Sequence, residues 1–176
     1  MYLNHDEILE LCESGYMKDW DKDCINAASL DVRLGSEILE EIDGITLNYA
    51  QRDKPNMHSI NINKGFVMYP GQFILAHTIE KCNLPDDIAA LFRIKSSMGR
   101  IGLEHMDAGW VDPGFNGSLT LEFKLMMERH RVVLKTGDRI GQLIFFRGKK
   151  VSEDKSYRAV GNYNGSNSVV QVGYQA

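Results

Sequence analysis

Hydrophobic and polar residues alternate along much of this chain with the two-residue period of a β-strand. Residues 29–34 show the pattern, because leucine and valine take every second position while Ser29, Asp31 and Arg33 take the others. We expect further strands at residues 73–77, 88–94, 119–125 and 140–146. The last of these is apolar almost throughout, so we expect it to be buried on both faces.

One clear helix is predicted, near the N-terminus. Asn4 can cap its first turn, and Glu7, three residues later, completes a capping box. The apolar residues that recur at helical spacing are Ile8, Leu9 and Cys12. Gly15 is a suitable residue to end this helix.

Turn signals separate the strands and indicate the fold class. They recur about every 10–20 residues, at residues 70–71, 83–87, 112–117 and 135–138. Frequent turns with a single helix favour a mainly β fold, a distorted β-barrel or jelly roll with a short N-terminal helix. We expect one domain over residues 1–176, with a flexible tail from about residue 152, where Gly, Asn, Ser and Tyr are common.

Charge and cysteine content narrow the function classes. The 176 residues include 20 Lys and Arg against 24 Asp and Glu, a net charge of -4. This argues against nonspecific binding to a nucleic acid polymer, but one nucleotide needs only a local basic pocket. The three cysteines form no Cys-x-x-Cys pair, so we expect free thiols and no protein zinc site. No signal peptide and no membrane-spanning apolar run are apparent, so we expect a cytoplasmic protein without membrane contact.

The densest cluster of polar residues lies between two expected strands. It consists of Lys95, Ser96, Ser97, Met98, Gly99 and Arg100. Its hydroxyls, cations and closely spaced backbone amides suit an anion, but a solvated turn or helix cap has the same composition.

Two carboxylates are also candidates. The period of two places Thr120, Glu122 and Lys124 on one face of their strand, which is either a solvent face or the floor of a pocket. Asp112 precedes Pro-Gly, where aspartate is common as the first residue of a turn.

Other polar residues have ordinary structural explanations. Asp31 and Arg33 could form a surface ion pair. Four histidines are expected in loops or at the surface: His58, His77, His105 and His130. Trp110 and Phe115 flank the Asp112 turn, where we expect core or rim packing, with stacking on a base as the alternative.

Five segments together resemble a known family. They are ASLDVRLG (28–35), KSSMGRIGL (95–103), AGWVDPGFNG (108–117), TLEF (120–123) and GDRIGQLIF (137–145). In this order they resemble dCTP deaminase, of the dUTPase-like superfamily, over residues 3–165. The resemblance implies the distorted β-barrel of that superfamily and a homotrimer with active sites between subunits. It also implies hydrolytic deamination of dCTP without zinc, with Mg²⁺ carried on the substrate triphosphate.

The resemblance assigns the catalytic roles to three residues. Glu122 matches the family's general base, which takes a proton from water so that hydroxide attacks C4 of cytosine. Arg100 matches the arginine that keeps this carboxylate ionised. Ser96 matches the serine that positions the water and the amino group.

The remaining roles concern substrate binding. Lys95 and Ser97 match the phosphate-binding stretch, in which Met98 and Gly99 follow. Asp112 matches the acceptor of the deoxyribose 3′-hydroxyl, and a 2′-hydroxyl would be excluded sterically. The residues expected to meet the pyrimidine through backbone groups are Thr120 and Leu121, with Tyr157 near the nucleotide.

Two segments depart from the family pattern. In the tail, Asn162 replaces a lysine that precedes a tyrosine, and the family's glutamine falls at Ser166 or Asn167. Leu125 stands where relatives have asparagine, so we expect the end of that hairpin to differ in shape.

Three functions follow from these features. The first is a plain dCTP deaminase that releases dUTP and ammonia. The second is a bifunctional enzyme that continues to dUMP and diphosphate, favoured by Gly109, where deaminase-only members can carry histidine. The third is a catalytically silent nucleotide-binding relative, which the altered tail permits but the presence of Ser96, Arg100 and Glu122 disfavours. A pure dUTPase would not need Glu122.

Overall fold

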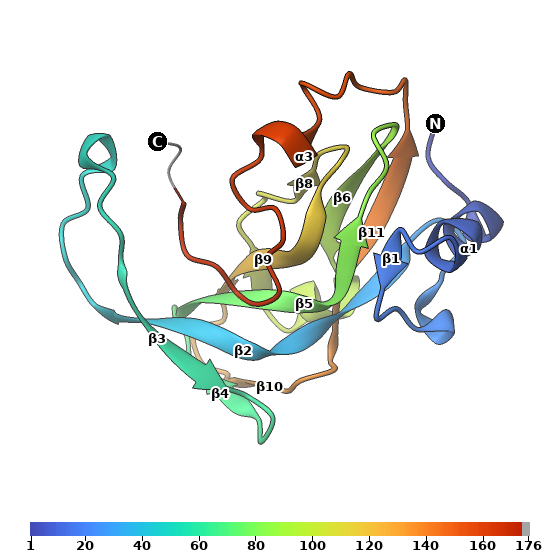
Figure 1. Cartoon of the computed structure of the whole chain (residues 1–176). Helices are drawn as coiled ribbons and strands as arrows, with labels where there is room; N and C mark the ends of the chain where they lie inside the picture. Colours follow the sequence, from blue (N-terminus) through green and yellow to red (C-terminus); the bar gives the residue numbers. More distant parts are fainter. Residues whose placement is uncertain (174–176) are drawn as a thin grey trace.

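A curled antiparallel sheet forms the centre of the molecule (Figure 1). The computed structural model describes residues 1–173, in which nine strands join in one sheet. The strands on its main path are, in spatial order, β7 (Leu103–His105), β9 (Asn116–Leu125), β5 (Phe73–Asn83), β2 (Leu30–Asp43), β11 (Arg139–Arg147), β6 (Ile88–Ile94) and β8 (Trp110–Val111). Beside this path, β1 (Met17–Lys18) pairs with β5, and β3 (Asn56–Asn61) pairs with β2.

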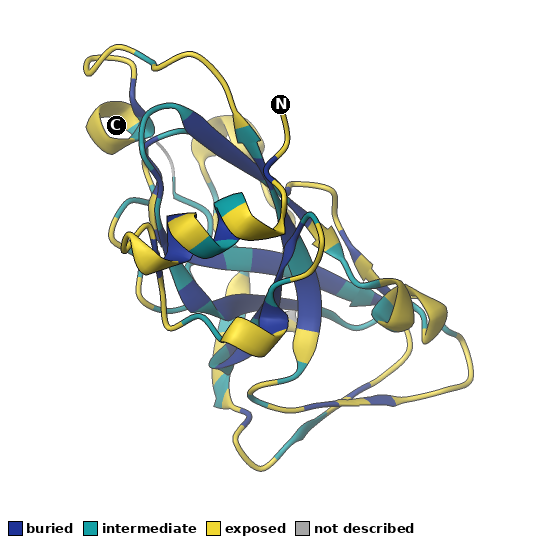
Figure 2. Cartoon of the chain, turned by 90° about the vertical axis from the view of Figure 1, so that its right-hand side faces the viewer, coloured by how far each residue is buried: buried dark blue, intermediate teal, exposed yellow. Residues whose placement is uncertain are grey.

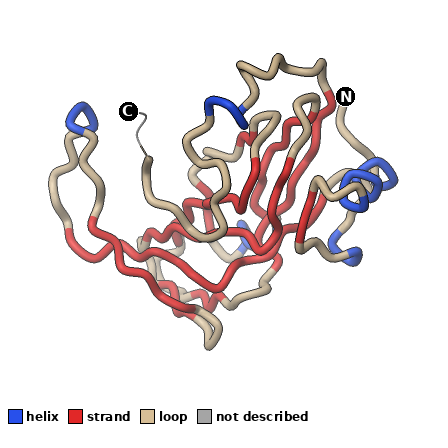
Figure 3. The backbone as a smooth tube through the Cα atoms, in the orientation of Figure 1, coloured by secondary structure: helices blue, strands red, loops and turns tan. Residues whose placement is uncertain are grey.

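The smaller elements surround this sheet. The short strands β4 (Phe66–Met68) and β10 (Val132–Leu134) pair with each other. The helical segments are α1 (His5–Glu13), η1 (Lys22–Cys24), η2 (Tyr49–Gln51), α2 (Ser96–Arg100) and α3 (Tyr157–Val160). In Figure 3 the strands curve into a half-barrel, which confirms the predicted mainly β fold. None of the helices in residues 1–173 is long and apolar enough to cross a membrane.

The N-terminal helix forms where the sequence predicts it. The Asn4 side chain accepts a hydrogen bond from the Glu7 amide, and the Glu7 side chain accepts one from the Asn4 amide, which completes the capping box. These bonds satisfy amides that the first turn would otherwise leave unpaired. The buried residues of α1 are Ile8, Leu11 and Cys12, so Leu11 rather than the expected Leu9 faces the core. Figure 2 draws the buried residues of the chain in dark blue.

Strand β2 is more buried than its alternating pattern predicts. Leu30, Val32 and Leu34 lie in the core as expected. The polar face is also covered, because Asp31 is only 2% exposed. Arg33 Nε donates to Glu80 Oε1 at 2.6 Å, so the predicted Asp31–Arg33 surface pair is wrong.

Strand β11 was expected to be buried on both faces, and the structure supports this for one face only. Ile140, Leu143 and Phe145 are fully buried, whereas Ile144 and Phe146 are half-buried. The half-buried residues line an open hollow beside the N-terminus.

The predicted turn at residues 112–117 determines how the chain enters β9. The Phe115 amide donates to the Asp112 carbonyl at 3.2 Å. Gly114 has φ +85°, a left-handed conformation that glycine adopts without steric cost. An added Cβ there would also lie 2.0 Å from Ser156 Oγ. This position therefore requires glycine for both backbone and packing reasons.

The C-terminal segment lies against the sheet. Tyr157 N–H donates to the Pro113 carbonyl at 3.0 Å, and Ser118 N–H donates to the Ser166 carbonyl at 2.8 Å. Figure 1 shows the red segment that follows α3 passing in front of β9 and β5. The flexibility expected from about residue 152 stays a prediction.

Candidate functional site

A cavity of about 620 Å³ lies beside β9. The parts of the chain that line it include β9, β5, the turn that contains Asp112, the start of α3 and the C-terminal segment. Its polar and ionisable lining residues are Asp112, Ser118, Thr120, Glu122, Tyr157, Tyr163, Ser166 and Gln171. A volume of several hundred cubic ångströms suits a nucleotide-sized ligand.

Strand β9 carries Glu122 into this cavity because side chains alternate across a strand. Leu121 and Phe123 lie in the core at 1% and 0% exposure, so Thr120 and Glu122 point the other way. Between the two interpretations that the sequence left open, the structure supports the pocket. The Glu122 side chain is 28% exposed.

The side chain beside Glu122 is His105. Its Nε2 lies 3.3 Å from Glu122 Oε2, and the His105 side chain is 5% exposed. The atoms are within ion-pair distance, yet neither makes a hydrogen bond with any residue that the structure describes. Two aromatic rings hold the imidazole, Phe92 at 4.7 Å and Phe123 at 5.7 Å between ring centroids.

His77 and His105 are both buried, at 9% and 5% exposure, so the surface or loop position predicted for them is wrong. His77 comes directly after the apolar run of β5, and its burial was detectable from that run. His105 gives no comparable local signal, because its partner lies on another strand.

The second part of the cavity is lined by Asp112 and by aromatic residues. Trp110 Nε1 donates to Asp112 Oδ1 at 2.9 Å, and the Trp110 ring is 57% exposed. Phe115 packs on Tyr157, with 5.5 Å between ring centroids. Burial raises the pKa of the Tyr157 phenol. A protonated phenol and a carboxylate near an exposed indole are suitable for binding a hydroxylated ring.

The cluster from Lys95 to Arg100 lies apart from this cavity. Lys95 precedes α2, and its Nζ lies 2.5 Å from Asp31 Oδ2. Ser96, Ser97 and Arg100 are exposed, and none of them lines the cavity. A single chain, over its described residues, therefore does not bring Arg100 to Glu122.

The site residues predicted from the sequence thus fall into two groups. The cavity contains Asp112, Thr120, Glu122 and Tyr157. The exposed segment around α2 contains Lys95, Ser96, Ser97, Met98, Gly99 and Arg100, with Met98 packed partly on the core. The Leu121 side chain belongs to the core, which leaves only its backbone for a ligand.

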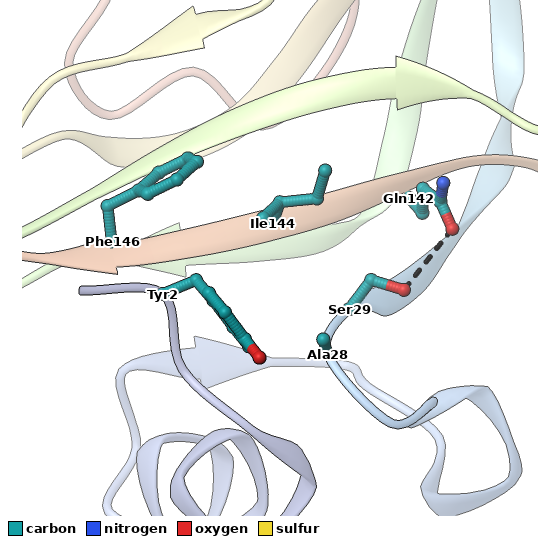
Figure 4. A pocket seen from close by; sticks show the side chains of 6 residues that line it. All are labelled: Tyr2, Ala28, Ser29, Gln142, Ile144 and Phe146. Atoms are coloured by element: carbon teal, nitrogen blue, oxygen red, sulfur yellow. Dashed lines mark hydrogen bonds between the residues drawn. The ribbon is translucent and has the colours of Figure 1, made fainter.

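A polar cluster that sequence reasoning missed surrounds Asp31. Asn26 Nδ2 donates to Asp31 Oδ1 at 2.9 Å, and Ser29 Oγ donates to Gln142 Oε1 at 3.2 Å. The second bond lies at the rim of the open hollow in Figure 4, whose other walls include Tyr2 and Phe146. The cluster holds the Lys95 ammonium beside a buried carboxylate.

The sequence pattern that defines the dCTP deaminase-like family matches residues 2–148. The chain belongs to the dCTP deaminase-like family. A protein of this family from Sulfurihydrogenibium sp. (strain YO3AOP1), named "dCTP deaminase, dUMP-forming", is 40% identical over 80% of this chain and 78% of its own length. One from Persephonella marina with the same name is 37% identical over 94% of this chain and 92% of its own.

A solved structure of the dCTP deaminase-like family shares the fold. The 2′-deoxycytidine 5′-triphosphate deaminase from Agrobacterium tumefaciens superimposes with a TM-score of 0.69 at 25% identity. The match covers 84% of this chain and 48% of that longer one.

Proposed function

We propose that this protein deaminates dCTP and then hydrolyses the triphosphate, giving dUMP, ammonia and diphosphate. The observation that supports it best is a carboxylate, Glu122, at the wall of a nucleotide-sized cavity in a family whose similar members are named dUMP-forming. A plain deaminase that stops at dUTP is the first function expected from the sequence. It has less support than the dUMP-forming function, because the similar proteins are named dUMP-forming.

The first step consumes one water molecule. Glu122 takes a proton from that water, hydroxide adds to C4 of cytosine, and the carboxyl delivers this first proton to N3. The carboxylate then carries the proton of the new C4 hydroxyl to the departing amine. The C4–N bond breaks, ammonia leaves and a carbonyl forms. A positioned base of this kind contributes about 10²–10⁴-fold to the rate.

The second step consumes another water molecule, which attacks the α-phosphorus. The α–β phosphoanhydride bond breaks, diphosphate leaves, and dUMP remains. Mg²⁺ enters as part of the substrate, on the triphosphate. No group of three His, Cys, Asp or Glu side chains within residues 1–173 could hold a metal ion on its own.

We infer that the complete site includes residues from a neighbouring copy, in a homotrimer. The support is that, in the described part of the chain, Lys95, Ser96 and Arg100 do not line the cavity that contains Glu122. In the proposed trimer, Arg100 and Ser96 of one copy face Glu122 of another, and Lys95 and Ser97 contact the phosphates. An adjacent guanidinium favours the ionised carboxylate that the base requires.

Gly109, the residue that favours the second activity in the sequence, lies close to the backbone of β6. Its carbonyl accepts from the Phe92 amide at 2.7 Å, and an added Cβ would lie 2.5 Å from the Phe92 carbonyl oxygen. Any side chain here must shift the loop that leads to Asp112. Glycine therefore fixes the loop close to β6, and a relative with a larger residue must place this loop differently.

The products from dCTP and Mg²⁺ test the proposal. Equal amounts of ammonia, dUMP and diphosphate are expected. Accumulation of dUTP with ammonia would indicate the plain deaminase instead. Nucleotide binding without any product would indicate the silent relative and overturn both enzymatic functions.

Substitution of the base tests the role of Glu122. Glu122→Gln should bind dCTP normally and lose deamination by about 10²-fold or more. Glu104→Gln is a matched control, because Glu104 is exposed on β7 opposite Lys124 and does not line the cavity. Near-normal turnover by Glu122→Gln would exclude this carboxylate as the base, and a monomeric mass at full activity would exclude the shared site.

A further inference from the structure

We propose that His105 is a positioning residue for Glu122, whose Nε2–H hydrogen-bonds Oε2 of the carboxylate when the nucleotide is bound. This inference rests on the proposed deamination. It gives a role to the buried imidazole of His105, which takes no part in the two proposed reaction steps.

Two unpaired atoms carry the proposal. His105 Nε2 and Glu122 Oε2 are both buried, and both lack a hydrogen-bond partner among the described residues. Burying a polar atom without a partner costs free energy, so native proteins rarely leave two such atoms side by side. They are 3.3 Å apart, and a small rotation of the carboxylate would align them.

The imidazole is fixed in place, whereas the carboxylate is freer to move. His105 ends β7, which pairs with β9 so that His105 lies opposite Phe123. The next residue, Met106, donates its amide to the Glu122 carbonyl at 3.1 Å. The ring also contacts Phe92, whereas the Glu122 side chain is 28% exposed. Since the histidine is held by backbone and ring contacts, it can determine the carboxylate's direction.

The chemistry requires the Nε2-protonated form of the imidazole. This nitrogen then donates to one carboxylate oxygen, and the other oxygen is left to accept the proton of the attacking water. A base held in one orientation is more effective than one that samples several rotamers. His105 itself neither touches the substrate nor takes up a proton.

Two substitutions of His105 test this geometry, because they place a side-chain amide at different distances from the Glu122 carboxylate. The Gln side-chain nitrogen reaches the position of Nε2, whereas the Asn nitrogen reaches only that of Nδ1. His105→Gln should keep kcat for ammonia release within a few-fold, and His105→Asn should lower it about 10- to 100-fold, the loss of one hydrogen bond to a charged group. KM for dCTP should change little in both.

The coupling to Glu122 is measured in a double variant. If His105 acts through the carboxylate, adding His105→Asn to Glu122→Gln should cause no further loss. His130→Asn, at an exposed loop position, is the control for an effect of histidine loss alone. Equal kcat for His105→Gln and His105→Asn, or a full additional loss in the double variant, would overturn the proposal.

A failure of the proposed function and a failure of the role of His105 give different results. If the wild-type protein releases no ammonia from dCTP, the proposed function fails together with this inference. If the wild-type protein is active and Glu122→Gln is inactive, but His105→Asn is as active as the wild type, only the role of His105 is refuted.

Discussion

The imidazole of His77 lies directly against the backbone of Gly35. A Cβ added at Gly35 would be 2.2 Å from two atoms of that ring, far inside van der Waals contact. Strand β2 bends near this contact, since its pairing with β5 shifts between Leu34 and Ile38. The glycine therefore allows a buried histidine from β5 to fit between the two strands.

Gly35→Ala should destabilise the fold by about 1–3 kcal/mol, because the added methyl overpacks a closed contact. Urea unfolding measures this change. Gly148→Ala is the control, since nothing lies within 4 Å of its added Cβ. Combining Gly35→Ala with His77→Ala should recover part of the loss, and a purely additive double variant would contradict the direct contact.

His77 should also make stability depend on pH. Burial lowers its pKa below the ordinary value of 6.5, while Glu37 on β2 favours the charged form and Lys81 on β5 opposes it. The folded chain thus binds this proton less tightly than the unfolded chain. The free energy of unfolding is unaffected while the pH stays above the pKa that His77 has in the unfolded chain. It falls as the pH drops below that pKa, by at most ~1.4 kcal/mol per pH unit. His77→Val should lose less stability than the wild type between about pH 7.5 and about pH 5.5. Equal losses would refute this assignment.

The buried ion pair between Arg33 and Glu80 gives a third prediction. Glu80 is fully covered and accepts from both the backbone and the side chain of Arg33. Arg33→Met removes the positive charge beside that carboxylate and leaves it only the hydrogen bond from the backbone amide, which should cost about 3–5 kcal/mol in unfolding free energy. Arg93→Met removes an exposed pair with Asp107 and should cost no more than about 1 kcal/mol. Similar costs for the two variants would show that burial of Glu80 is unimportant.

Local chemistry explains which features the sequence predicts. The capping box of α1 depends on residues three apart, and the alternation of β9 places Glu122 on the face opposite Leu121 and Phe123. Both are therefore readable along the chain. The pairing of Arg33 with Glu80 joins residues 47 positions apart, and the neighbour of Glu122 lies on β7. Such pairs depend on strand order, which the local pattern does not encode.

The last prediction concerns the C-terminal segment that covers the cavity. Ser168 Oγ donates to Glu37, and Val170 N–H donates to Thr120 Oγ1 at 3.1 Å. The hydrogen bonds from Ser168 and Ser59 lower the pKa of Glu37, so this anchor is charged at neutral pH.

Ser168→Ala should therefore loosen the segment without unfolding the sheet. The lost bond to a charged group predicts about 10-fold or faster amide exchange at Val170, with little change in global stability. Hydrogen exchange measured by mass spectrometry tests this. Asn167→Ala is the matched control, because over residues 1–173 that side chain bonds only to the Gly165 carbonyl within the segment. If both variants exchange at the wild-type rate, the contact with Glu37 does not hold the segment over the cavity.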